Sequence, residues 1–128
     1  MDETKAREDQ TILVVEDNID MLNLIGRILM EEGYRTILAA DSTYGMAMLK
    51  ESSPDLVMLD IRMPGMDGYA ILQSIRQTSN VPVIMVTANW DTQAVQKSFD
   101  LGADDYIKKP FSPAELAARV KAKLRRPR

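Results

Sequence analysis

Five side chains that could bind a metal ion or phosphate each follow a short apolar run in the sequence. They comprise three acids, a hydroxyl and an amine: Glu16, Asp17, Asp60, Thr87 and Lys109. A single acid after a strand usually caps a helix or forms a turn. The ligands of open parallel sheets, however, bind beyond the carboxyl ends of the strands. Five such residues at equivalent points of the chain therefore predict one polar site at a sheet edge.

The residue types at this edge suit a metal ion and a phosphoryl group. Three carboxylates held close together repel one another unless a cation lies between them. Because only oxygen ligands are present, the hard cation Mg²⁺ is the natural choice. Lys109 and Thr87 add a positive charge and a hydroxyl, which suit phosphoryl oxygens. An aspartate can accept a phosphoryl group as an acyl phosphate, so the pattern predicts phosphate chemistry at a carboxylate.

Motifs and composition exclude several other chemistries. The sequence lacks the glycine-rich nucleotide loops G-x-x-x-x-G-K-[ST] and G-x-G-x-x-G. It contains neither cysteine nor histidine, which excludes disulfides, thiolate nucleophiles, Cys/His zinc sites and imidazole catalysis within the chain. The 128 residues, 45 % of them hydrophobic, are enough for one domain with a sizeable core. No signal peptide or apolar run of membrane-spanning length is visible, so we expect a cytoplasmic protein without membrane contact.

Charge is nearly balanced over the chain, with a net value of −3. Six of the 16 basic residues nevertheless fall within positions 119–128. One interpretation is a helix end whose cations complement the helix dipole and continue into a linker. The other is a patch that binds nucleic acid.

Apolar, β-branched runs alternate with longer stretches that suit helices. The runs expected to form strands are 12–15, 36–38, 56–59, 83–86 and 106–107. Runs without polar alternation suit strands that are covered on both faces. The alternation predicts an α/β fold, a five-stranded parallel sheet with right-handed crossovers and helices on both faces.

The first and last expected helices have the clearest signals. Asn18 can cap the start of the first helix and Gly33 its end. Its apolar stripe is expected at Met21, Leu24, Ile25 and Ile28. The last helix begins with Ser112 as N-cap, Pro113 at the first position and Glu115 at the third, and its apolar face carries Leu116, Val120 and Leu124. Three more helices are expected from Asp41 or Ser42 to about 51, over 66–77 and over 91–101.

Four segments make residues 11–126 resemble the receiver domain of two-component response regulators. They are ILVVEDN, VMLDIRMPGMDGY, VPVIMVTA and GADDYIKKPF, in this order and spacing. The resemblance implies a (βα)5, flavodoxin-like, doubly wound fold. It leaves residues 1–10 as a flexible leader and 127–128 as a tail or the start of a linker.

The resemblance also implies roles for individual residues. Asp60 corresponds to the phosphoacceptor, and Glu16 and Asp17 to the acidic pair that helps it hold Mg²⁺. The backbone carbonyl of Arg62 would complete the protein's share of the metal ligands. Because the chain has no histidine, the phosphohistidine donor would belong to a partner, a sensor histidine kinase or a phosphotransfer protein.

Other matched positions concern the response to phosphorylation. Thr87 corresponds to the switch hydroxyl and Tyr106 to the aromatic residue that turns inward with it. Lys109 corresponds to the lysine that pairs with phosphoryl oxygens, and the Lys109–Pro110 bond is implied to be cis. Ala88 is the small residue that leaves room for the donor. Arg62 and Asn89 hold positions that tune the lifetime of the phosphoryl group.

The C-terminal segment is similar to regulators of the OmpR/PhoB type, which dimerise through the fourth helix, fifth strand and fifth helix. Two of the ion pairs of that face are matched here, Asp105 with Arg119 and Asp100 with Lys121. A third is broken, because Val95 stands where a basic partner for Glu115 is expected. A homodimer through this face is therefore possible, while direct nucleic-acid binding by the domain is not expected. The chain could be a stand-alone receiver or the regulatory domain of a larger, DNA-binding regulator.

Two alternatives use the same residues differently. In a metal-dependent phosphohydrolase Asp60 would be a nucleophile that turns over, but the second acid expected two positions later is Arg62. In a pseudo-receiver the fold would persist without phosphorylation, which the presence of all five site residues disfavours. We therefore expect a phosphoacceptor that assists its own phosphorylation and dephosphorylation rather than an enzyme.

Overall fold

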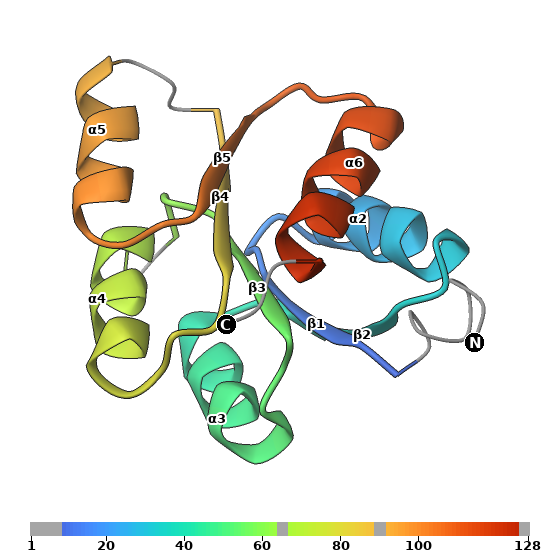
Figure 1. The fold of residues 1–128 in the computed structure, drawn as a ribbon, viewed down its shortest axis with the longest axis horizontal. Coiled ribbons are helices and arrows are strands. Elements are labelled where there is room, and N and C mark those ends of the chain that lie inside the picture. The colour runs from blue at the N-terminus through green and yellow to red at the C-terminus, as the bar shows by residue number, and fades with distance from the viewer. Residues whose placement is uncertain (1–8, 64–66, 89–91, 126–128) are drawn as a thin grey trace.

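Strands and helices alternate along the chain, as Figure 1 shows. The computed structural model describes residues 9–63, 67–88 and 92–125. The elements in chain order are β1 (Thr11–Val15), α2 (Ile19–Glu31), β2 (Arg35–Ala39), α3 (Ser42–Ser52), β3 (Leu56–Leu59), α4 (Gly68–Thr78), β4 (Val83–Thr87), α5 (Thr92–Asp100), β5 (Asp105–Lys108) and α6 (Pro113–Leu124). Positions 66 and 91, where two helices were expected to begin, and most of the leader and tail predicted at 1–10 and 127–128 lie outside the described residues.

The five strands form one parallel sheet in the order β2-β1-β3-β4-β5. Val15 at the end of β1 is in register with Ala39 of β2 on one side and Leu59 of β3 on the other. The chain moves one way from β1 to β2 and the other way from β3 onward, so the order reverses between β1 and β3. The predicted α/β fold with a doubly wound parallel sheet is confirmed.

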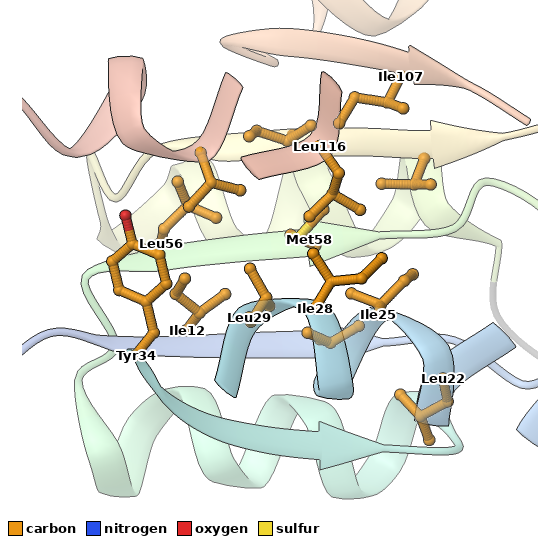
Figure 2. Close-up of a cluster of buried hydrophobic side chains, with 14 residues drawn as sticks. Ile12, Leu22, Ile25, Ile28, Leu29, Tyr34, Leu56, Met58, Ile107 and Leu116 are labelled. Atoms are coloured by element: carbon orange, nitrogen blue, oxygen red, sulfur yellow. The ribbon is translucent and has the colours of Figure 1, made fainter. Parts of the chain in front are cut away.

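Helices cover both faces of the sheet. Figure 1 shows α2 and α6 on one face and α3, α4 and α5 on the other. Beneath α2 and α6 lies a cluster of buried side chains that includes Ile12, Leu29, Met58 and Leu116, drawn in Figure 2. A second cluster, under α3 and α4, includes Leu13, Leu59, Ile71 and Met85. Neighbouring strand residues such as Ile12 and Leu13 fall in different clusters because side chains alternate between the faces of a strand.

Short polar side chains fix the start of four helices. Asn18, Asp41, Asp67 and Ser112 each accept a hydrogen bond from the backbone N–H three residues ahead. Such caps satisfy one of the first-turn donors that have no partner within the helix. Gly33, just past the end of α2, adopts φ +96°, a conformation that favours glycine. The caps predicted at Asn18, Ser112 and Gly33 are confirmed, and of the two candidates for α3, Asp41 is the cap.

The predicted apolar stripe of α2 is wrong in one respect. Ile25 and Ile28 are buried as expected, but Leu24 is 43 % exposed. Leu22 and Leu29 are buried instead. The sequence from Ile19 to Met30 carries apolar residues around most of the helix, and two stripes about 100° apart both fit the helical period. Contact with the sheet selects the stripe centred on Leu22, Ile25 and Leu29.

Over the described ranges, no helix is long and apolar enough to cross a membrane.

Candidate functional site

The two central strands bring the acids of the site together. Val15 and Leu59 are in register, so Glu16 and Asp60 follow at the same level of the sheet. The Asp60 N–H donates to the Val15 carbonyl at 3.1 Å, and the Glu16 N–H donates to the Ala39 carbonyl at 3.0 Å. The site therefore lies where the strand order reverses, beyond the carboxyl ends of β1 and β3, the usual place for a ligand in such sheets.

Glu16, Asp17 and Asp60 form a cluster in which one carboxylate oxygen of each residue lies within 4.8 Å of the other two. Glu16 and Asp60 are buried, whereas Asp17 is exposed to solvent. A pair of buried acids with a third at the surface offers inner ligands and an open side for water or a phosphoryl oxygen. This set of hard oxygen donors fits a divalent cation such as Mg²⁺.

Lys109 reaches the cluster from the end of β5. Its Nζ lies 2.5 Å from Glu16 Oε1 and 3.5 Å from Asp60 Oδ2. The Lys109–Pro110 peptide bond is cis, as the sequence resemblance implied, and the Lys109 N–H donates to the Thr87 carbonyl at 2.9 Å. One ammonium group faces three carboxylates, so the cluster retains an excess of negative charge.

Glu16 is the acid most perturbed by this arrangement. Its pKa is raised from 4.5 to about 7: burial is the main cause, the nearby Asp60 acts in the same direction, and the hydrogen bonds from Lys109 and from the Asn18 N–H partly oppose the rise. Desolvation disfavours the carboxylate form, and a cation near it favours that form. A cation bound by the cluster would therefore favour the charged form of Glu16.

Thr87 and Tyr106 lie on β4 and β5, the two strands that follow β3 in the sheet. Thr87 ends β4 and is buried. Tyr106 is in register with Met85, packs against the cluster under α3 and α4, and has a buried hydroxyl oxygen. Met85 and Thr87 are two residues apart on β4, so Thr87 and Tyr106 face the same side of the sheet.

Arg62 and Ala88 occupy the loops around Asp60. The Arg62 N–H donates to Asp60 Oδ1 at 3.3 Å, which holds the loop after β3 against the acid. The Arg62 side chain and Ala88 are exposed. Asn89, the other residue expected to affect phosphoryl lifetime, lies outside the described residues.

The residues expected at a dimer face lie on α5, β5 and α6. Arg119 Nη1 lies 2.9 Å from Asp105 Oδ1, and Arg119 Nε lies 3.3 Å from Glu115 Oε2. Both contacts are within one chain. Asp100 accepts from Gln96 Nε2 at 2.8 Å, and Lys121 lies on α6.

The fold and the acidic cluster at its switch point define a class, a doubly wound α/β domain with carboxylates at that point. Comparison with known proteins assigns this domain to a family. Residues 12–121 match the family described as the response regulator receiver domain. The chain belongs to this family.

Relatives and solved structures agree with this assignment. The chain is 44 % identical over 117 residues to the DNA-binding response regulator MtrA of Mycolicibacterium paratuberculosis, covering 91 % of this chain and 52 % of that protein. It is 43 % identical over 119 residues to the probable transcriptional regulator ycf27 of Porphyridium aerugineum, covering 93 % of this chain and 50 % of that protein. The chain thus spans about half the length of these relatives.

Two solved structures have folds very similar to that of this chain. A two-component response regulator from Clostridium difficile superposes with a TM-score of 0.89 at 28 % identity, covering 92 % of this chain and 98 % of that one. The BeF3-activated N-terminal receiver domain of Klebsiella pneumoniae RstA has a TM-score of 0.88 at 30 % identity, covering 91 % of this chain and 100 % of that one.

Proposed function

We propose that this receiver domain is a phosphoryl-accepting switch whose acceptor is Asp60. The observation that carries the proposal is the position of the Asp60 carboxylate, grouped with two other carboxylates and 3.5 Å from the Lys109 ammonium. The donor is a phosphohistidine of a sensor histidine kinase or a phosphotransfer protein, because the chain itself has no histidine. An Asp60 oxygen attacks phosphorus, the phosphorus–nitrogen bond breaks with its electron pair going to the imidazole, and an acyl phosphate forms.

We assign the acidic cluster to Mg²⁺. Asp17, Asp60 and Glu16 would supply carboxylate ligands and Arg62 its backbone carbonyl. The bound cation supplies charge neutralisation for the phosphoryl oxygens. The raised pKa of buried Glu16 supports this assignment, because a cation can replace the proton that the site otherwise takes up.

The Lys109 ammonium lies near two carboxylates, those of Glu16 and Asp60. In the unphosphorylated chain its ammonium is closer to Glu16 than to Asp60. A phosphoryl group on Asp60 presents more negative charge than the carboxylate it replaces, so Lys109 moves toward its oxygens. Lys109 then stabilises the charge that develops during transfer.

Phosphorylation is proposed to act on the α5-β5-α6 face through Thr87 and Tyr106. Thr87 ends β4 and Tyr106 lies on β5, so a shift of the Thr87 hydroxyl toward the phosphoryl group changes the packing beneath this face. The face then forms a symmetric homodimer that uses Asp100, Asp105, Arg119 and Lys121. Arg119 would exchange contacts within its own chain for contacts with a second copy.

The proposed unit is residues 11–126, with 1–10 as a leader and 127–128 as the start of a linker or a tail. We place it in the cytoplasm, where the proposed kinase would present its phosphohistidine. Because one relative is named a DNA-binding response regulator and this chain spans about half of it, the unit is either a stand-alone receiver or the regulatory part of a longer regulator. Any contact with nucleic acid would belong to that other part.

Phosphorylation by a small donor tests the proposal. The purified chain is incubated with Mg²⁺ and acetyl phosphate, and its intact mass is followed beside the fluorescence of its single tryptophan, Trp90. The expected result is the gain of one phosphoryl group that EDTA or Asp60→Asn abolishes. Full labelling of Asp60→Asn would refute the acceptor assignment. Sustained phosphate release from excess donor would indicate a phosphohydrolase, and no mass gain or fluorescence response would indicate a pseudo-receiver.

A further inference from the structure

We infer that Gly68 is a positioning residue for Asp60, and this inference rests on the proposed function of Asp60. Gly68 is the first residue of α4 and is buried against the backbone that follows β3. Its N–H donates to the Ile61 carbonyl at 2.7 Å. The start of α4 is therefore attached directly to the residue after the proposed phosphoacceptor.

The contact leaves no room for a side chain at position 68. A Cβ atom there would lie 2.7 Å from Ile61 Cα and 3.0 Å from the Asp60 carbonyl carbon, and closer still to the Asp60 carbonyl oxygen. All three are backbone atoms, which cannot rotate away as a side chain can. A larger residue must push the Asp60–Ile61 backbone or the start of α4 out of place.

Space rather than backbone conformation is what requires glycine here. Among the described glycines, positive φ occurs at Gly33 and Gly102 and not at Gly68. An L-residue could adopt the backbone conformation of Gly68 without strain. The close approach to Asp60 is thus the physical reason for a glycine at this position.

The backbone of Asp60 is held from two sides. On one side its N–H donates to Val15 of β1, the residue before Glu16, at 3.1 Å. On the other side Gly68 packs against its carbonyl group. The contacted peptide leads to Arg62, whose carbonyl is a proposed metal ligand. A displacement at Gly68 would therefore move two proposed Mg²⁺ ligands relative to Glu16 and Asp17.

Gly68→Ala tests the inference, with Gly26→Ala as the matched control. A Cβ at Gly26 would meet Leu38 Cδ1 at 2.8 Å, but that atom is the end of a flexible side chain far along the sequence from Asp60. We expect Gly68→Ala, measured well below its melting temperature, to bind Mg²⁺ about fivefold more weakly and to accept phosphate from acetyl phosphate about tenfold more slowly. Gly26→Ala should retain the wild-type Mg²⁺ affinity and rate. Calorimetric titration with Mg²⁺ alone gives a readout that does not depend on phosphorylation.

A second set of variants covers the case in which Gly68→Ala does not fold. Asp67 caps α4 by accepting from the Ala70 N–H at 2.8 Å, and Asp41 caps α3 by the equivalent bond at 2.7 Å. Asp67→Ala should loosen the first turn of α4 and weaken Mg²⁺ binding. Asp67→Asn keeps a capping oxygen without the charge, so it should bind Mg²⁺ as the wild type does. Asp41→Ala should also leave the affinity unchanged.

The positioning role and the proposed function fail in different ways. Wild-type Mg²⁺ affinity in folded Gly68→Ala, or equal affinities of Asp67→Ala and Asp67→Asn, would overturn the positioning role. A wild-type chain that binds Mg²⁺ but takes no phosphoryl group from acetyl phosphate would overturn the proposed function and still allow the affinities to be compared.

Discussion

At the scale of single residues, Glu16 decides how the acidic cluster behaves. It is 1 % exposed, its pKa is about 7, and it holds the Lys109 ammonium at 2.5 Å. The sequence predicts that the acids meet, because the ends of apolar runs mark the ends of strands. It does not predict which of Glu16 and Asp17 is buried, because both follow the same strand and consecutive side chains point to opposite sides. The pKa of Glu16 follows from that burial and was therefore not predictable either.

The raised pKa of Glu16 predicts a pH dependence of stability. An acid whose pKa is higher in the folded chain than in the unfolded chain binds more protons when folded. Its contribution to the free energy of unfolding is fully present below the pKa of the unfolded chain and is lost as pH rises through the pKa of the folded chain. For Glu16 the window runs from 4.5 to about 7. Without Mg²⁺, the free energy of unfolding of the wild type should fall across this window relative to Glu16→Gln by up to about 3 kcal/mol. Urea denaturation at several pH values measures the free energy of unfolding of both proteins. A difference between them that stays constant with pH would contradict the prediction.

A second prediction at this scale concerns the competition between Lys109 and the metal. Lys109→Met removes the cation that occupies Glu16, so Mg²⁺ should bind several-fold more tightly. The same change removes the group proposed to stabilise the phosphoryl oxygens, so phosphorylation by acetyl phosphate should slow by about 100-fold. Lys108→Met, one residue earlier on β5, is the control. If Mg²⁺ affinity and rate fell together, Lys109 would instead be needed to assemble the metal site.

At the scale of elements, Arg76 of α4 connects the segments that precede β4 and β5, at the end of the sheet opposite the acidic cluster. Its guanidinium donates to the Gly102 carbonyl at 3.0 Å and to the Val81 carbonyl at 2.7 Å. It also pairs with Asp104 at 2.9 Å, and Asp104 accepts from the Val83 N–H at 2.8 Å. One side chain of α4 thus ties the start of β4 to the turn between α5 and β5. Sequence reasoning missed this contact, because periodicity marks apolar faces of elements and carries no signal for a polar residue that spans 26 positions.

Arg76→Met should destabilise the fold without changing the acidic cluster. It removes the Arg76 donor from the Val81 and Gly102 carbonyls and the charged partner from the Asp104 carboxylate. We expect this loss to lower the free energy of unfolding by about 2–4 kcal/mol. Arg27→Met, at an exposed position of α2, should change stability by less than about 0.5 kcal/mol. Denaturant titration gives both values. A loss of Mg²⁺ affinity in folded Arg76→Met would show that the two ends of the sheet are coupled.

The first helix shows the same limit of sequence reasoning in another form. The caps at Asn18 and Gly33 are local chemistry and were predicted correctly. The predicted buried face of α2 differs from the observed one because Leu24 and Leu22 fit the helical period equally well. Only the direction from which the sheet approaches distinguishes them. Local signals in the sequence thus locate the element, and tertiary packing sets its rotation.

At the scale of the whole molecule, the site at the edge between β1 and β3 and the α5-β5-α6 face are connected through the strands between them. Thr87 ends β4, and Lys109 directly follows β5. The order of elements predicts this arrangement, because five βα units leave few ways to form a parallel sheet. The sequence could not show that Arg119 pairs with Asp105 inside one chain, since the two residues that suit a dimer also suit each other.

Charge reversal at this pair separates contacts within a chain from contacts between chains. Asp105→Arg and Arg119→Asp each place like charges opposite one another, both within the chain and across a symmetric dimer. Mixed in equal amounts, the two variants restore opposite charges only between chains. We therefore expect that, with Mg²⁺ and acetyl phosphate, each variant alone sediments as a monomer while the mixture and the wild type sediment as dimers. The Arg119 side chain is 41 % exposed, so Arg119→Asp should cost little stability, about 1 kcal/mol or less. The Asp105 side chain is 17 % exposed, so Asp105→Arg should cost more. Dimers of either variant alone, or monomers in the mixture when the phosphorylated wild type is dimeric, would show that Asp105 and Arg119 do not meet across the interface.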